Sequence, residues 1–112
     1  ALAGWLYMLR WQKNVRIQGA ASIVILALSL WLQIDAYGLA LIIVVITLVW
    51  MAEFLNAAAE AVVNLATDEW HPMAKVGKDV ASAAVPLSAI ASVLVGLLVL
   101  GPPLLQRLGV VG

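Results

Sequence analysis

The sequence predicts an all-α membrane protein with three transmembrane helices and a cytoplasmic hairpin between the second and third. Of its 112 residues, 65% are hydrophobic and only 11% are charged, and the mean hydropathy is +1.09. A soluble domain is about half apolar and about a quarter charged, so this chain has too few polar side chains to cover a water-facing surface. Three windows contain no charged residue, 17–34, 36–52 and 80–106. Each is close to or longer than the roughly 17–25 residues that cross a bilayer.

Composition also limits the classes of site that the chain can carry. No repeat, low-complexity tract or linker interrupts it, so we expect one integral-membrane domain over residues 1–112. Cysteine is absent, which excludes disulfides, thiolate nucleophiles and cysteine-ligated metals. The single histidine, His71, is too few for a histidine-based metal cage within one chain. The net charge of zero argues against nucleic acid as a partner.

The first predicted helix covers about residues 17–34. It does not resemble a cleaved signal peptide, because no basic segment starts the chain and the apolar run continues through a short turn into the next window. Apart from Arg107, all basic residues lie before this helix or between the second and third helices. By the positive-inside rule, the N-terminus is expected in the cytoplasm and the C-terminus outside, in a multi-pass protein of the inner or plasma membrane.

The second predicted helix covers about residues 36–65 and carries a polar stripe. At 100° per residue, its polar side chains fall within about 80° of one another. The first of them, Glu53, is 18 residues beyond Asp35, or about 27 Å along a helix, and so is expected at the cytoplasmic edge of the membrane. Carboxylate and amide oxygens on one stripe suit Mg²⁺, although simple pairing of the carboxylates with Lys or Arg of a neighbouring helix is the alternative. The stripe consists of Glu53, Asn56, Glu60 and Asn64.

The third predicted helix covers about residues 79–101, after a polar hairpin at 67–80 that turns at Pro72. We expect Gly101-Pro102-Pro103 to end this helix, because two successive prolines interrupt the backbone hydrogen bonds. Residues 67–69 suggest a helix N-cap or, as the favoured interpretation, a solvated turn. Polar side chains at the start of the helix share one face, where they could hold phosphate or anchor the chain to anionic lipid. They are Lys75, Lys78, Asp79 and Ser82.

Two segments together resemble the signature of the small prokaryotic diacylglycerol kinases, a family that includes undecaprenol kinases. They read EFLNAAAEAVV at residues 53–63 and EWHPMAKVGKDVASAAV at residues 69–85. The likeness covers nearly the whole chain, including NVRIQ at residues 14–18. It implies a homotrimeric kinase that transfers the γ-phosphate of ATP, with Mg²⁺, to a lipid hydroxyl at the cytoplasmic surface, giving undecaprenyl phosphate or phosphatidic acid.

The resemblance also implies roles for individual residues. Glu53 matches the catalytic base that accepts the proton of the lipid hydroxyl. Glu60 matches the metal ligand, supported by Asn56, and Gln12 stands where many members have a glutamate that shares the metal, which leaves the metal count open. The implied ATP contacts are Glu60, Glu69, Trp70, His71, Lys78, Asp79 and Gln12. The implied lipid contacts are Glu53, Ser82, Arg16, Gln18 and Trp31.

Other functions and branches remain open at the level of sequence. A small oligomeric proton or cation transporter would also need a membrane carboxylate, but would be expected to place it near mid-membrane. A noncatalytic membrane scaffold would not need the convergent polar residues. The absence of a longer amphipathic N-terminal helix favours the polyprenol-using branch, whereas the sequence does not decide between undecaprenol and diacylglycerol.

Overall fold

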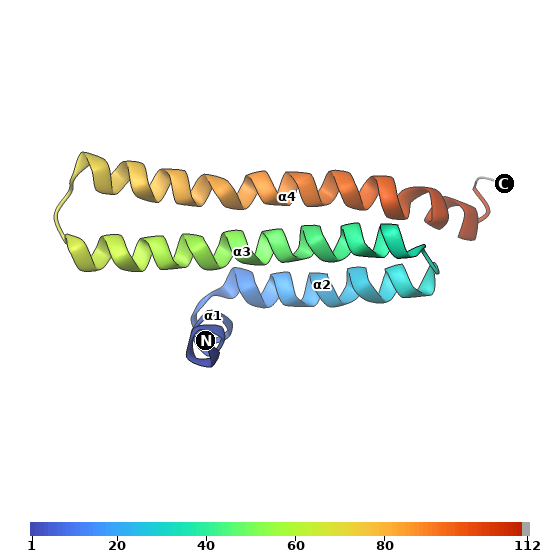
Figure 1. The fold of residues 1–112 in the computed structure, drawn as a ribbon, viewed down its shortest axis with the longest axis horizontal. Helices are drawn as coiled ribbons and strands as arrows, with labels where there is room; N and C mark the ends of the chain where they lie inside the picture. Colours follow the sequence, from blue (N-terminus) through green and yellow to red (C-terminus); the bar gives the residue numbers. More distant parts are fainter. Residues whose placement is uncertain (111–112) are drawn as a thin grey trace.

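The computed structural model of the chain describes residues 1–110. It consists of four helices: α1 (Leu2–Trp11), α2 (Lys13–Trp31), α3 (Ala36–Ala66) and α4 (Pro72–Arg107) (Figure 1). Three of them, α2, α3 and α4, are long and apolar enough to cross a membrane, and residues 1–110 contain no strand. The predicted all-α class with three helices able to cross a membrane is therefore confirmed. Residues 111 and 112 of the expected 1–112 domain lie outside the described residues.

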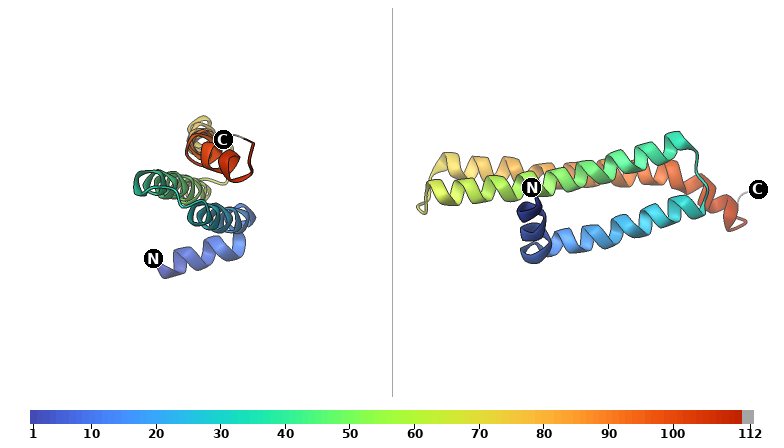
Figure 2. Two further views of the ribbon diagram at one scale, coloured as in Figure 1. Left: turned by 90° about the vertical axis from the view of Figure 1, so that its right-hand side faces the viewer. Right: turned by 60° about the horizontal axis from the view of Figure 1, so that its bottom comes forward.

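The N-terminal part differs from the predicted boundaries. Residues 2–11 form α1, which the sequence prediction did not include, and α2 runs over Lys13–Trp31 rather than 17–34. The extended backbone of Gln12 separates the two helices and turns α1 across the N-terminal end of α2 (Figures 1 and 2). The guanidinium of Arg16 donates to the carbonyls of Leu9 and Arg10, which have no partner within α1. A membrane-spanning helix can carry charged residues near its ends. The predicted start at residue 17 is therefore too late, because it coincides with the first residue of the charge-free window.

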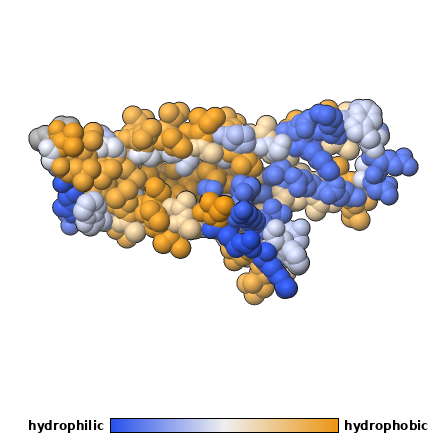
Figure 3. All heavy atoms as spheres, turned by 180° about the vertical axis from the view of Figure 1, so that it is seen from behind, coloured by the Kyte–Doolittle hydropathy of each residue, from blue (hydrophilic) through white to orange (hydrophobic). Residues whose placement is uncertain are grey.

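The three long helices lie side by side, with α3 between α2 and α4 (Figures 1 and 2). At 1.5 Å per residue, the 19 residues of α2 extend over about 28 Å, close to the hydrocarbon thickness of a bilayer. The 31 residues of α3 and the 36 residues of α4 extend over about 46 and 54 Å. Both therefore continue beyond α2, and hydrophilic residues gather at the end where the two are connected (Figure 3).

Helix α4 corrects the predicted end at Gly101-Pro102-Pro103. It continues through both prolines to Arg107 and begins at Pro72 rather than 79. The prolines remove two backbone donors, but their fixed φ is compatible with a helix. The last turn is held from outside: the Arg107 guanidinium donates to the carbonyl of Trp31 over 2.9 Å and lies 4.6 Å from the centre of its ring. A contact with the end of α2 therefore stabilises a turn that the local sequence disfavours.

The buried apolar side chains of α3 follow one stripe of the helix. Ile42, Val45, Val49 and Ala52 recur at spacings of three and four residues, and the stripe ends at Glu53. In contrast, Leu100 is the one buried residue that the structure describes on α4. The apolar surfaces of α2 and α4 are left for contact with lipid or with other copies.

A close approach of helices fixes the end of the molecule opposite the α3–α4 connection. Asp35 caps α3 by accepting a hydrogen bond from the Gly38 amide over 2.7 Å. A Cβ at Gly38 would lie 3.0 Å from the Asp35 Oδ1 and 3.1 Å from the Cγ1 of Val99 on α4. Because glycine has no Cβ, position 38 can accept the Asp35 cap of α3 and also pack closely against Val99 of α4.

We expect Gly38→Ala to lower the free energy of unfolding by about 1–3 kcal/mol, because the added methyl group displaces Val99 or weakens the cap. Denaturation of purified protein in detergent measures this loss. Gly96→Ala is the matched control, since a Cβ at position 96 meets nothing within 4 Å. Equal stability of the two variants would contradict the packing of α4 against the start of α3.

Candidate functional site

A polar cleft of about 540 Å³ opens between the end of α3, the connection and the start of α4. Its volume lies in the range of about 300–1,000 Å³ that is usual for sites of small molecules. Of the predicted ATP contacts, the structure brings Glu69, Trp70, His71, Lys78 and Asp79 together here. The remaining lining residues are Val63, Asn64, Thr67, Asp68, Ala74 and Lys75.

Local hydrogen bonds shape the connection that forms the floor of the cleft. The Thr67 amide closes α3 by donating to Val63, and its hydroxyl accepts from the Glu69 amide over 3.2 Å. Residues 67–69 are thus a turn, as favoured from sequence, and the N-cap of α4 is His71. Its Nδ1 accepts from the Met73 amide over 3.1 Å, so in the neutral ring Nε2 carries the proton. His71 can therefore donate a hydrogen bond to a ligand while it caps α4.

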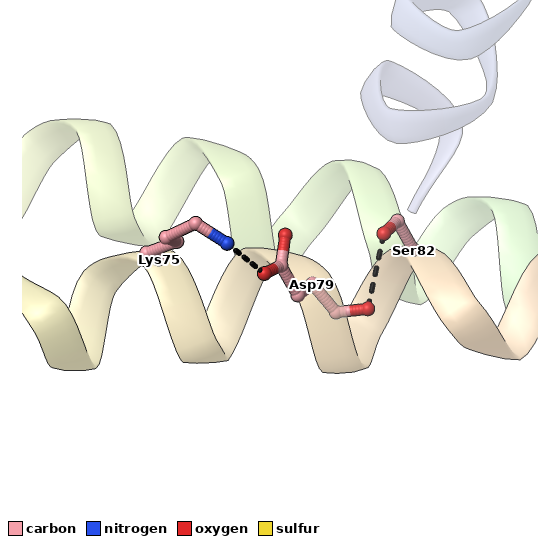
Figure 4. A network of polar contacts seen from close by, with 3 residues as sticks. All are labelled: Lys75, Asp79 and Ser82. Carbon is pink, nitrogen blue, oxygen red and sulfur yellow. Dashed lines mark hydrogen bonds and ion pairs between the residues drawn. The ribbon is translucent and has the colours of Figure 1, made fainter.

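Two lysines of α4 carry the positive charge of the cleft. The Nζ of Lys75 lies 2.6 Å from the Oδ2 of Asp79, one turn further along α4 (Figure 4). Both side chains are more than half exposed, so this pair adds little stability and is free to exchange for a ligand. The Nζ of Lys78 donates to the Oδ1 of Asn64 on α3 over 2.6 Å. Each ammonium thus has one partner and keeps donors for an anion such as phosphate.

Ser82 lies on the same face but is bound to the backbone. Its hydroxyl donates to the carbonyl of Asp79 over 3.1 Å (Figure 4). The side chain is exposed and does not line the cleft. It is free to accept a hydrogen bond from a group arriving along α4.

The carboxylate stripe continues from the cleft towards the membrane-spanning part of α3. Glu53 is 9% exposed, and the Oδ1 of Asn56 is buried without a hydrogen-bond partner in the described chain. Glu60 is exposed. From Asn64 in the cleft to Glu53 is 11 residues, or about 16 Å along α3. One face of α3 therefore carries Asn64 at the cleft and, further along the helix, the buried carboxylate of Glu53.

Helix α1 marks the level of Glu53. The ring of Phe54 meets the ring of Trp5 edge to face, with 4.9 Å between centroids. The short helix crosses the bundle at the N-terminal end of α2, where the hydrophobic part of the surface gives way to hydrophilic residues (Figures 2 and 3). Glu53 is thus at the boundary between the apolar and the polar part of the molecule.

No group of three acidic, histidine or cysteine side chains within residues 1–110 is arranged to hold a metal by itself. Mg²⁺, however, usually takes one or two carboxylates and completes its shell with water and phosphate oxygens. Glu60 and the unpartnered Oδ1 of Asn56 are oxygen donors of this type. The donors present therefore fit a Mg²⁺ ion that arrives with a phosphate ligand.

Four of the predicted contacts do not line the cleft and are not part of the stripe on α3. Gln12 is the extended residue between α1 and α2, and Arg16 is engaged in capping α1. Gln18 lies at a cavity of about 370 Å³ between α2, α3 and α4 that is lined mostly by apolar side chains. Trp31 contacts Arg107 at the opposite end.

The cleft also contains Asn64 and Lys75, to which the resemblance assigned no role. Asn64 was part of the predicted polar stripe, and Lys75 was part of the polar face of the third helix. Their presence in the cleft depends on the hairpin, which places the two faces opposite each other.

Comparison with known proteins identifies a family and relatives that match most of the chain. The sequence profile described as prokaryotic diacylglycerol kinase matches residues 1–100. The chain is 39% identical over 107 residues to a diacylglycerol kinase of Synechocystis and 37% identical over 79 residues to that of Escherichia coli K12. It is 34% identical over 95 residues to the undecaprenol kinase of Bacillus subtilis.

These matches cover most of the chain but less of its relatives. They extend over 95%, 70% and 85% of this chain for the Synechocystis, E. coli and B. subtilis proteins, respectively. The matched segment spans 61% of the Synechocystis protein, 65% of the E. coli protein and 77% of the B. subtilis protein.

Proposed function

Because the chain belongs to the prokaryotic diacylglycerol kinase family, we propose that it transfers the γ-phosphate of ATP to a hydroxyl group of a membrane lipid. The observation that carries this proposal is the placement of two sets of polar residues on one hairpin. The cleft presents two lysines of α4 at the polar end, and Glu53 lies at the apolar boundary, on the face of α3 that also carries Asn64 of the cleft. A soluble nucleotide and a lipid hydroxyl approach a membrane surface from these two sides.

The cleft is the proposed binding site for ATP. Lys75 and Lys78 offer ammonium donors to the phosphates, and the Nε2 of His71 offers a third. The N-terminus of α4 also lies at the cleft, where the positive end of the helix dipole favours negative charge. Glu69, Trp70 and Asp79 supply the remaining contacts with the nucleotide, and the phosphates extend along the stripe towards Glu60.

Glu53 is the proposed catalytic base. It accepts the proton of the lipid hydroxyl while that oxygen attacks the γ-phosphorus, and ADP leaves with the bridging oxygen. Burial in the apolar boundary keeps the carboxylate away from bulk water and within reach of a headgroup hydroxyl. Ser82, Arg16, Gln18 and Trp31 are the proposed lipid contacts along the path of the substrate.

Glu60 and Asn56 are the proposed Mg²⁺ ligands, and Gln12 offers a neutral amide oxygen in place of a second carboxylate. The ion, when bound, neutralises charge on the phosphates during transfer. Asn56 keeps an unpartnered oxygen ready, and Glu60 lies one helical turn nearer to the cleft.

The proposed assembly is a homotrimer in the inner or plasma membrane, with the hairpin and N-terminus in the cytoplasm and the C-terminus outside. Two properties of the chain support it. The polar cleft holds lysines, as the positive-inside rule requires of a cytoplasmic segment. In addition, only 6% of the residues in the most apolar window of α4 are buried within one chain, which leaves apolar surface for neighbouring copies and lipid.

Undecaprenol and diacylglycerol are the two proposed substrates, since the chain matches relatives named diacylglycerol kinase and a relative named undecaprenol kinase. Purified protein in lipid, Mg²⁺ and γ-labelled ATP tests the function when each lipid is offered in parallel. We expect label in one of the two extracted lipids. Absence of label in both would overturn the lipid kinase proposal.

We expect Glu60→Gln to raise the Mg²⁺ concentration needed for half-maximal activity by about tenfold or more, because the ion loses a charged ligand. A Mg²⁺ titration at fixed ATP measures the shift. Asp35→Asn is the matched control: it removes one carboxylate at the opposite end and keeps a side chain that can cap α3. An unchanged titration for Glu60→Gln would contradict the metal role.

A further inference from the structure

A hydrogen bond between two helices lies one turn from Glu53. The indole Nε1 of Trp50 on α3 donates to the Oγ of Ser22 on α2 over 3.1 Å, and Ser22 is 9% exposed. The Ser22 hydroxyl donates its own proton to the carbonyl of Gln18, 2.7 Å away, so its lone pairs are available to Trp50. Within residues 1–110, this is the one side-chain hydrogen bond that joins α2 to α3.

The indole is also confined on its other sides. A Cβ added at Gly19 would lie 3.6 Å from the Cη2 and Cζ2 atoms of Trp50, so the ring rests on the surface that this glycine leaves flat. Trp5 of α1 and Phe54 lie at centroid distances of 5.6 and 6.0 Å from the indole. Trp50 is therefore held by α1 and α2 at a single level of the bundle.

The hydrogen bond between Trp50 and Ser22 fixes the rotation of α3 about its own axis, which the neighbouring apolar side chains do not determine. Trp50 and Glu53 are three residues apart and so lie about 60° from each other around α3. The buried residues beside them, Val49 and Ala52, make only apolar contacts, and lipid offers apolar surface of the same kind. A hydrogen bond has a direction, so rotation of α3 breaks it and at the same time carries Glu53 out of its buried position.

We propose that Trp50 and Ser22 are positioning residues, whose hydrogen bond fixes the rotation of α3 that holds Glu53 at the reaction centre. The proposal rests on the proposed function for its catalytic consequence. Its geometric part, the dependence of the Glu53 position on this bond, does not require the protein to be a kinase.

The kinetic test compares Ser22→Ala, Trp50→Phe and the double variant. We expect each single change to lower kcat about tenfold, because small displacements of a reacting group are costly. The double variant should lose the same tenfold rather than the product of two losses, since either change removes the one bond. KM for ATP should stay unchanged, because Trp50 is 14 residues, or about 21 Å, from Asn64 in the cleft.

Two further variants separate positioning from a general need for buried hydroxyls. Ser29→Ala is the matched control, since Ser29 is fully buried on the same helix and donates only to the carbonyl of Ile25 within α2. It should retain wild-type kcat. Ser22→Thr keeps the hydroxyl and should recover most of the activity lost in Ser22→Ala. Multiplicative losses in the double variant, or equal losses in Ser22→Ala and Ser29→Ala, would overturn the proposal.

A labelling measurement tests the geometry without activity. The chain contains no cysteine, so Glu53→Cys introduces a single thiol. We expect the rate of its reaction with a membrane-permeant maleimide to rise at least threefold when Ser22→Ala is added, and to stay constant when Ser29→Ala is added. Equal rates in all three backgrounds would overturn the positioning proposal. Failure of the wild-type chain to phosphorylate either lipid would instead overturn the proposed function, and labelling would still decide the geometric part.

Discussion

Glu53→Gln is expected to lower kcat for lipid phosphorylation by about 10²–10⁴-fold, the range that a general base contributes. Glutamine has the size of glutamate but cannot take up the proton of the attacking hydroxyl. The side chain is 9% exposed and ends the buried stripe of α3, so an amide of the same shape should leave the packing intact. KM for ATP should change little, since the cleft lies about 16 Å away along the helix.

The measurement is initial rate against ATP and against lipid, with a melting curve for each variant. Glu53→Asp is the informative companion, because it keeps the carboxylate but withdraws it by one methylene group. It should retain more activity than Glu53→Gln. A Glu53→Gln variant that is folded and turns over at the wild-type rate would show that another group accepts the proton.

Lys78→Met is expected to lower kcat/KM for ATP by about 10- to 100-fold, which corresponds to the ~1.5–3 kcal/mol of a hydrogen bond to a charged group. The Nζ of Lys78 lies 2.6 Å from the Oδ1 of Asn64, which holds the ammonium in the cleft between α3 and α4. Methionine keeps the length of the side chain and removes the charge. The proposed phosphate contact is lost, whereas the fold keeps its apolar stem.

Steady-state kinetics over a range of ATP concentrations measures this loss. Lys13→Met is the matched control, because Lys13 is exposed at the start of α2 and does not line the cleft. Lys78→Arg should preserve part of the activity by keeping a cation. An unchanged ATP dependence in Lys78→Met would contradict the location of ATP in the cleft.

Most of the fold could be predicted because bilayer thickness and hydropathy limit the possibilities. The second predicted helix, 36–65, nearly coincides with α3 (Ala36–Ala66), whose start is marked by the Asp35 cap. The end of α4 could not be read from local sequence, because Arg107 reaches across to Trp31 and holds a turn that follows two prolines. Helix α1 was missed since its stability depends on Trp5 packing against Phe54 and Trp50 of a distant helix.

Some features of the candidate site could likewise be predicted from the sequence, and others could not. Helical periodicity predicted the stripe of Glu53, Asn56 and Glu60, and residue spacing predicted one polar face on the third helix. The pairing of Lys78 with Asn64 could not be predicted, because the two are 14 residues apart and meet only through the hairpin. Ser22 and Trp50 carry no periodic signal, since one serine and one tryptophan in apolar helices are ordinary packing residues until the helices are placed side by side.

Simultaneous measurement of ADP and of labelled lipid phosphate tests the central claim most directly. Purified protein in lipid vesicles receives γ-labelled ATP, Mg²⁺ and one candidate lipid, and the two products are counted at matched times. In the proposed reaction the phosphate moves directly from ATP to the lipid hydroxyl, so we expect one labelled lipid phosphate for each ADP, with both products lost in Glu53→Gln. Formation of ADP with free phosphate and no labelled lipid would contradict the lipid kinase and favour ATP hydrolysis without a lipid acceptor.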